Sequence, residues 1–174
     1  MKILVMGGTR FVGKSLVGKL LSQNHDIDIF TRGNKANPEK TNLIKGDRNS
    51  LEGIIKLKNK KYDVIYDISG RELEQTKILI ENLADSFQRY IYVSSAGVYK
   101  DNCELPLSEA DPIDPESRHK GKFETENWLK NQKFLLQVLD QLIFMDLEII
   151  IKLKIGFLKD YLLINPSQYL VTGL

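Results

Sequence analysis

The 174-residue sequence predicts an α/β fold in which a doubly wound parallel sheet carries helices on both faces. Short runs rich in β-branched and aromatic residues alternate with longer segments whose apolar residues recur at helical spacing. Runs such as DVIYDIS and IYVSS are nearly continuous in apolar residues, as is typical of strands that are covered on both faces. Alternating βα units with right-handed crossovers make neighbouring strands parallel.

Five strands and four helices are expected in order along the chain. The strands are predicted at residues 3–6, 27–31, 42–45, 63–68 and 89–95. The helices are predicted at residues 11–23, 50–57, 73–85 and 116–130, the last after a loop that contains three prolines. In the first helix, we expect four side chains to face the sheet: Phe11, Leu16, Leu20 and Leu21.

The composition is that of a globular domain, with 42% apolar and 28% charged residues. A net charge of +2 does not require a polyanionic partner, and we interpret the lysines between residues 56 and 61 as a solvated face. The single cysteine, Cys103, excludes an internal disulfide and a thiolate-rich metal site. Charged residues interrupt the apolar stretch at 134–164, which argues against a membrane span. We therefore expect a cytoplasmic protein with no metal.

A glycine-containing turn, GGTRFVG, joins the first strand to the first helix. A glycine at the strand end permits a tight turn, and Gly13 allows the helix to pack closely on the strand. The N–H groups and positive end of the helix are then available to the pyrophosphate of a dinucleotide. The sequence thus predicts a Rossmann-type fold whose cofactor-binding residues include Gly7, Gly8, Thr9, Arg10, Phe11, Val12 and Gly13.

Two basic residues bear on which dinucleotide binds. Arg10 stands where the usual spacing has its middle glycine, so its guanidinium is a candidate contact for a cofactor phosphate. The second strand ends in FTRG and lacks the acid that binds a ribose 2′-hydroxyl, whereas Arg32 suits a 2′-phosphate. NADP is therefore favoured over NAD, the alternative being that Arg32 is only solvated.

These ordered features resemble the NAD-dependent epimerase/dehydratase family, the extended short-chain dehydrogenase/reductases, over residues 1–132. The resemblance implies that Asp47, in GDR, bonds the adenine edge. It also implies that Ser69 and Gly70, in DVIYDISG, border the cofactor. In RYIYVSSAGVYKD, Ser95 aligns with the active-site Ser/Thr of the family.

The catalytic tyrosine of that family is missing from the matching segment. The family uses a tyrosine and a lysine four residues later for proton transfer, and DPESRHKGKFETE aligns Lys122 with the lysine and Arg118 with the tyrosine. An arginine stays protonated and cannot replace a phenol. His119 is a titratable candidate in its place, the alternative being a solvent-facing or capping histidine. The catalytic candidates are therefore Ser95, Lys122 and His119.

The combination GGTRFVG, FTRG, SSAGVY and SRHKGK is most similar to the chloroplast stem-loop RNA-binding proteins and their cyanobacterial relatives. That resemblance implies a Rossmann fold whose members bind RNA and, in some cases, cleave it. If RNA binds, phosphate contacts would come from the lysines at 56–61. Taken together with Arg118 and Arg32, it makes the first interpretation a catalytically degenerate, NADP-leaning Rossmann protein that binds RNA. Two alternatives stay open. One is a nucleotide-sugar epimerase, dehydratase or reductase that uses NAD(P). The other is a non-functional product of a broken gene.

From residue 133 onward, the pattern changes to a tail crowded with leucine and isoleucine. Back-translation in a shifted frame yields IPFTSFRPTYIYGPG, which resembles the sixth strand and the following motif of the family. We therefore expect a frameshift near Lys133, a Rossmann domain at 1–132 and an aberrant tail at 133–174. The sheet would then be truncated after about the fifth strand, with an uncovered edge unless the tail packs there. Such a chain would be poorly soluble and marginally stable.

Overall fold

The computed structural model describes residues 1–100, 111–132 and 135–139. Within these residues, a parallel sheet has the strand order β3-β2-β1-β4-β5-β6, which confirms the predicted Rossmann-type fold. The strands are β1 (Lys2–Met6), β2 (Asp26–Thr31), β3 (Asn42–Lys45), β4 (Tyr62–Asp67), β5 (Phe87–Val93) and β6 (Leu135–Leu139). From β1, the chain adds β2 and β3 on one side and then β4, β5 and β6 on the other, so the strand order reverses between β1 and β4. A ligand-binding crevice is expected at the carboxyl ends of these two strands.

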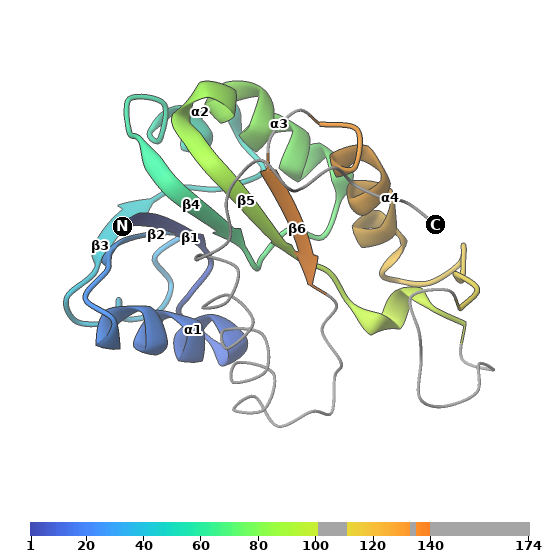
Figure 1. Cartoon of the computed structure of the whole chain (residues 1–174), viewed down its shortest axis with the longest axis horizontal. Helices are drawn as coiled ribbons and strands as arrows, with labels where there is room; N and C mark the ends of the chain where they lie inside the picture. The colour runs from blue at the N-terminus through green and yellow to red at the C-terminus, as the bar shows by residue number, and fades with distance from the viewer. Residues whose placement is uncertain (101–110, 133–134, 140–174) are drawn as a thin grey trace. The chain divides into compact units, whose positions relative to one another are not determined.

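Helices cover both faces of the sheet, as Figure 1 shows: α1 lies on one face, and α2, α3 and α4 lie on the other. Their bounds are α1 (Phe11–Ser22), α2 (Leu51–Ile55), α3 (Leu73–Leu83) and α4 (Lys120–Leu129), with short 3₁₀ helices η1 (Ala84–Ser86) and η2 (Ala96–Val98). The last helix begins four residues later than predicted. The cause is a turn in which Asp114 accepts hydrogen bonds from the N–H groups of Glu116 and Ser117.

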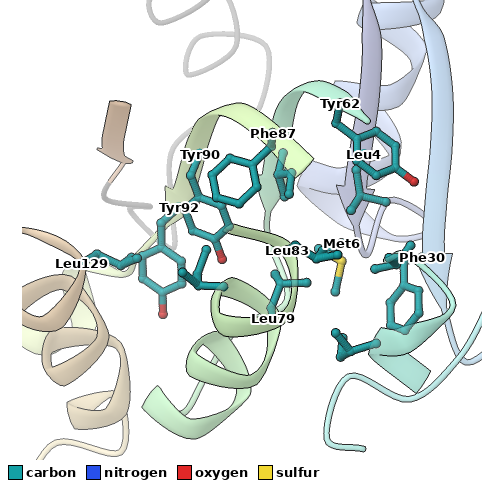
Figure 2. Close-up of a cluster of buried hydrophobic side chains, with 14 residues drawn as sticks. Leu4, Met6, Phe30, Tyr62, Leu79, Leu83, Phe87, Tyr90, Tyr92 and Leu129 are labelled. Carbon is teal, nitrogen blue, oxygen red and sulfur yellow. The ribbon is translucent and has the colours of Figure 1, made fainter. Parts of the chain in front are cut away.

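The larger part of the core lies between the sheet and the helices α2, α3 and α4. Figure 2 shows apolar side chains from β1, β2, β4 and β5 meeting Leu79 and Leu83 of α3 and Leu129 of α4. Because successive side chains of a strand point to opposite faces, Leu4 and Met6 belong to this cluster, and Ile3 and Val5 do not. The central strands β1, β4 and β5 are therefore buried on both faces, as the nearly continuous apolar runs of β4 and β5 predicted.

One predicted packing residue of α1 is wrong. Leu16 and Leu20 are buried and Leu21 is half-buried, but Phe11 is 75% exposed. Phe11 is the first residue of α1 and has a φ of +44°, a conformation that directs its side chain away from the row formed by the others. Its ring instead lies against Arg10, whose guanidinium carbon is 4.9 Å from the ring centroid.

The outer edge of β5 is paired. The parallel strand β6 continues the sheet, in register from Arg89 opposite Leu135 to Val93 opposite Leu139. These residues come from the predicted tail, so the sheet extends one strand beyond the expected truncation. The tail therefore covers the edge of β5 that would otherwise have been exposed. The rest of the tail, residues 140–174, lies outside the described residues, and the frameshift stays a prediction.

A charged cluster joins the amino ends of four strands. The buried carboxylate of Asp28 accepts from Lys2 at 2.5 Å, Tyr62 at 3.0 Å and Asn42 at 3.1 Å, and Lys60 lies 3.3 Å away. Burial alone would raise the pKa of Asp28, but the hydrogen bonds from Lys2, Asn42 and Tyr62 outweigh it and lower the pKa. Lys60 therefore has a partner within the fold.

Among residues 1–100, 111–132 and 135–139, we find no helix of the length and apolarity that a bilayer crossing requires.

Candidate functional site

The turn after β1 adopts a backbone that favours glycine at two successive positions. Gly7 and Gly8 have φ values of +111° and +95°, in a region that L side chains rarely adopt. The Gly7 N–H donates to the carbonyl of Phe30 in β2 at 3.0 Å. The chain therefore leaves β1, turns sharply and enters α1 at the carboxyl edge of the sheet, as predicted.

Gly13 allows the first turn of α1 to lie against this loop. A Cβ added at Gly13 would lie 2.7 Å from both the Cα and the N of Gly8, closer than real Cβ contacts. The N-cap residue is Arg10, which makes no side-chain capping hydrogen bond, and no acid occupies the first helical turn. The first N–H groups of α1 and its positive end are thus left to an anion from outside the helix.

The other predicted residues of this turn differ in exposure. Arg10 and Phe11 are exposed and in contact with one another, whereas Thr9 and Val12 are half-buried. The guanidinium thus lies beside the open helix end, and its contact with a cofactor phosphate stays a prediction.

The carboxyl end of β4 borders the glycine turn. The Cβ of Ser69 is 3.5 Å from the position that a Cβ on Gly7 would occupy, and Ser69 is exposed. Gly70 is buried, and its N–H donates to Oδ1 of Asp67 at 3.0 Å. The structure therefore brings together the predicted residues of β1 and β4 at the point where the strand order reverses.

A buried ion pair that the sequence analysis missed supports this border. Arg48 donates through Nη1 to Oδ1 of Asp67 at 2.6 Å and through Nη2 to Oδ2 at 2.8 Å. Nη1 also donates to Oγ of Ser69 at 2.8 Å, and the Tyr90 hydroxyl donates to Oδ2 of Asp67 at 2.6 Å. The signal in the sequence was Asp67, an acid that directly follows the apolar run VIY at the end of a strand. A buried charge of this kind requires a partner.

The pair is ionised because its members compensate one another. Burial by itself raises the pKa of Asp67, but the charge and hydrogen bonds of Arg48 outweigh it, so the pKa of Asp67 lies below its ordinary value. The adjacent carboxylate likewise holds the pKa of Arg48 above its ordinary value, against the opposing effect of burial.

The two predicted residues at the ends of β2 and β3 lie on loops. Arg32 is exposed and sits between Thr31 and Gly33, whose N–H donates to Oγ1 of Thr31 at 3.0 Å. Asp47 is half-buried and accepts the N–H of Asn49 through Oδ1 at 2.9 Å. Both residues follow strands on the far side of β1 from β4 and β5.

Lys122 of α4 connects the carboxyl ends of β4 and β5. Its ammonium donates to the carbonyl of Gly70 at 2.8 Å and to that of Val93 at 2.6 Å. It also lies 5.1 Å from the centroid of the Tyr92 ring. Burial lowers the pKa of Lys122 to about 8 against the attraction of Asp67, and Arg48 adds to the lowering. Two of the three ammonium protons are therefore committed to backbone acceptors.

Ser95 and His119 meet at Gly97. Oγ of Ser95 accepts the Gly97 N–H at 3.2 Å, and a Cβ on Gly97 would lie 2.6 Å from Cδ2 of His119. Nε of Arg118 donates to Nε2 of His119 at 3.0 Å. Burial and the neighbouring Arg118 lower the pKa of His119, so the imidazole is neutral at pH 7. The three catalytic candidates thus share the region where β5 and α4 meet.

The site therefore has two parts along one edge of the sheet. The glycine turn offers an anion site beside Ser69, and the second part groups a neutral histidine, a serine and a lysine that is held by backbone carbonyls. Such an edge suits a long ligand with phosphates at its centre.

Comparisons with known proteins identify a family and several relatives. A family model described as "NAD dependent epimerase/dehydratase family" matches residues 3–132. The chain is 41% identical over 147 residues to the chloroplast stem-loop binding protein of 41 kDa b from Arabidopsis thaliana, an alignment that covers 75% of this chain and 39% of that protein.

Solved structures share the fold at lower identity. A UDP-glucose 4-epimerase from Thermus thermophilus in complex with NAD has a TM-score of 0.69 at 18% identity, covering 80% of this chain and 54% of that one. The enzyme from Bifidobacterium longum in complex with NAD+ and UDP has a TM-score of 0.70 at 18% identity, covering 80% of this chain and 52% of that one. The chain thus spans about half the length of these structures and less of the Arabidopsis protein.

Proposed function

The chain belongs to the NAD dependent epimerase/dehydratase family, and from this premise we propose that it binds a nicotinamide dinucleotide at the glycine turn without the tyrosine-dependent chemistry of the family. The observation that carries the proposal is the contact of Gly13 with the backbone of Gly8, which leaves no room for a Cβ. Arg10 at the N-cap makes no side-chain capping hydrogen bond, so the N–H groups at the start of α1 are available to a ligand.

The residues present fit such a cofactor. The N–H groups at the start of α1 would hold the pyrophosphate, Asp47 the adenine edge, and Ser69 with Gly70 the side of the crevice. When bound, the nicotinamide ring would supply a site that accepts or donates a hydride. The open helix end, with a donor rather than an acceptor at its N-cap, supports this assignment.

Calorimetric titration of the full chain with NADP+ and with NAD+ tests the proposal. We expect saturable binding of at least one of them. Absence of heat with both, for a chain whose circular dichroism shows the α/β fold, would remove the proposed function.

We propose NADP+ as the preferred cofactor. Arg32 is exposed on the loop after β2, where an acid for the ribose hydroxyls is missing, and this supports recognition of a 2′-phosphate. Replacement of Arg32 by aspartate would reverse the preference, weakening NADP+ and strengthening NAD+ binding. An unchanged ratio of the two dissociation constants would contradict this assignment.

Loss of the family chemistry is supported by the position of Arg118 and the engagement of Lys122. Arg118 stands four residues before Lys122 and donates to His119, and the Lys122 ammonium is held by two carbonyls. The chain would then keep the cofactor for structure or regulation. We expect no hydride transfer with UDP-glucose as substrate.

One observation favours an enzymatic alternative. The neutral imidazole of His119 lies against Gly97, and the N–H of Gly97 donates to Oγ of Ser95. In that case, His119 would take the proton-transfer role and Ser95 would orient a nucleotide-sugar. The alternative predicts measurable turnover that His119→Ala abolishes and His119→Gln does not restore, with cofactor affinity unchanged. Turnover in wild type that survives both substitutions would exclude it.

RNA binding is a further proposal, supported by the similarity to the Arabidopsis stem-loop binding protein. The lysines of residues 56–61 are less available than expected, since Lys56 donates to the Lys45 carbonyl, Lys61 to the Asp85 carbonyl, and Lys60 pairs with Asp28. Filter binding with a stem-loop RNA across a salt series is the test. Affinity should fall steeply with salt, and a salt-independent signal or none would contradict RNA binding.

A further inference from the structure

We propose that Lys45, at the end of β3, is a second specificity-determining cation for the 2′-phosphate of NADP+, acting beside Arg32. This inference rests on the proposed function and names a residue that neither the motif nor the family match assigns. It is carried by the way in which two neighbouring strands end.

The side chain of Lys45 lies against the loop that bears Arg32. Thr31 and Lys45 are register partners at the ends of β2 and β3, and neighbouring strands lie about 4.8 Å apart. A Cβ added at Gly33 would lie 3.1 to 3.3 Å from the Cδ, Cε and Cγ atoms of Lys45. The aliphatic stem therefore passes beside Gly33, the residue that follows Arg32.

The loop is shaped to accept this stem. Gly33 has a φ of +75°, and its N–H is bound by Oγ1 of Thr31, so the backbone turns tightly after Arg32. A residue with a side chain would be strained at this φ and would also have to displace the lysine methylenes. Glycine at position 33 thus permits a basic side chain from β3 to approach the arginine loop.

The local charge is positive. Lys56 of the segment after α2 donates to the carbonyl of Lys45 at 3.0 Å, which brings a third cation to the end of β3. The next acid in the sequence is Asp47, two residues after Lys45, and its Oδ1 accepts the Asn49 N–H. Within the part of the chain that the structure describes, no ion pair joins Arg32, Lys45 or Lys56 to an acid. Cations of this kind are suited to a phosphate dianion rather than to a neutral ribose diol.

The 2′-phosphate is the only difference between NAD+ and NADP+, so a contact with it affects the affinity for NADP+ alone. Substitution of an exposed cation that contacts the phosphate should therefore change the affinity for NADP+ and leave that for NAD+ unaltered. A lysine that only supports the fold would affect both nucleotides alike.

The test compares Lys45→Gln with a matched control, Lys19→Gln, which removes a charge from the last turn of α1. That turn leads into the amino end of β2, whereas Lys45 is at the carboxyl end of β3. We expect the dissociation constant of NADP+ to rise about three- to ten-fold in Lys45→Gln, as for the loss of one exposed charge-assisted hydrogen bond. NAD+ binding should stay within about two-fold, and the control should change neither nucleotide by more than that margin. Gly33→Ala should reproduce the selective loss by displacing the lysine stem.

The outcomes separate this inference from the proposed function. Equal weakening of both nucleotides in Lys45→Gln, or no change in either, overturns the role of Lys45 while dinucleotide binding stands. If wild type binds NAD+ and not NADP+, the role of Lys45 is likewise overturned while dinucleotide binding stands. If wild type binds neither nucleotide, the proposed function fails first and this inference with it.

Discussion

Arg48 holds Asp67 by two parallel hydrogen bonds of 2.6 and 2.8 Å at the carboxyl end of β4, between the proposed cofactor site and the core. Through a third bond, the same guanidinium fixes Ser69, and the carboxylate also receives Tyr90 and the N–H of Gly70. The pair thus connects the loop after β3 to the crevice.

The first prediction concerns this ion pair. Arg48→Met and Asp67→Leu should each lower the free energy of unfolding by about 3 to 5 kcal/mol, because each leaves an uncompensated buried charge. The double variant should recover a large part of that loss. Urea denaturation of all four proteins forms the cycle, and additive losses in the double variant would show that the two charges do not compensate one another.

The glycine turn offers a matched pair of substitutions within one helix. Gly13→Ala places a Cβ 2.7 Å from the backbone of Gly8 and should abolish dinucleotide binding, whereas nothing lies within 4 Å of a Cβ at Gly18. Gly18→Ala should raise the stability by about 1 kcal/mol, as expected for alanine in a helix interior, and leave binding unchanged. Calorimetry and thermal denaturation measure the two effects. Equal binding by both variants would contradict the close packing of α1 on the turn.

A pH dependence is expected from Lys122. Its pKa in the folded chain is about 8, below the ordinary 10.5 that applies when the chain is unfolded. Between these values, the unfolded chain binds more protons, so the contribution of Lys122 makes stability rise as the pH increases from about 8. Above about pH 10, the raised pKa values of buried Tyr62 and Tyr92 act in the opposite direction. The window to measure is therefore pH 8 to 10.

Comparison of the unfolding free energy of wild type and Lys122→Met across that window isolates the contribution of the lysine. The difference between the two proteins should change with pH in the stated direction. A constant difference would mean that the ammonium titrates in the folded chain as it does in water.

The exposed position of Phe11 leads to a further prediction. Phe11→Ala should change the stability by no more than about 0.5 kcal/mol, because the ring packs on Arg10 and not on the sheet. Leu16→Ala, in the buried row of the same helix, should cost about 2 to 5 kcal/mol. Thermal denaturation of the two variants is sufficient. A large loss in Phe11→Ala would restore the packing role that the sequence suggested.

Local pattern determined much of this protein. The alternation of apolar strands and amphipathic helices predicted a parallel sheet, and the spacing of Gly7, Gly8 and Gly13 predicted the turn, because these features depend on residues close in sequence. The predicted residues of the cofactor site follow successive strands for the same reason, since parallel strands end at one edge.

Only the tertiary structure decided the contacts between residues far apart in the chain. The partnership of Arg48 with Asp67 spans 19 positions, the bond from Lys122 to Gly70 spans 52, and the approach of Lys45 to Gly33 depends on the register of β2 and β3. The pairing of β6 with β5 likewise required the assembled sheet. Hydrogen-bond partners and shared edges are set by which strands become neighbours, and no local pattern of residue types encodes which polar side chain will meet a given buried charge.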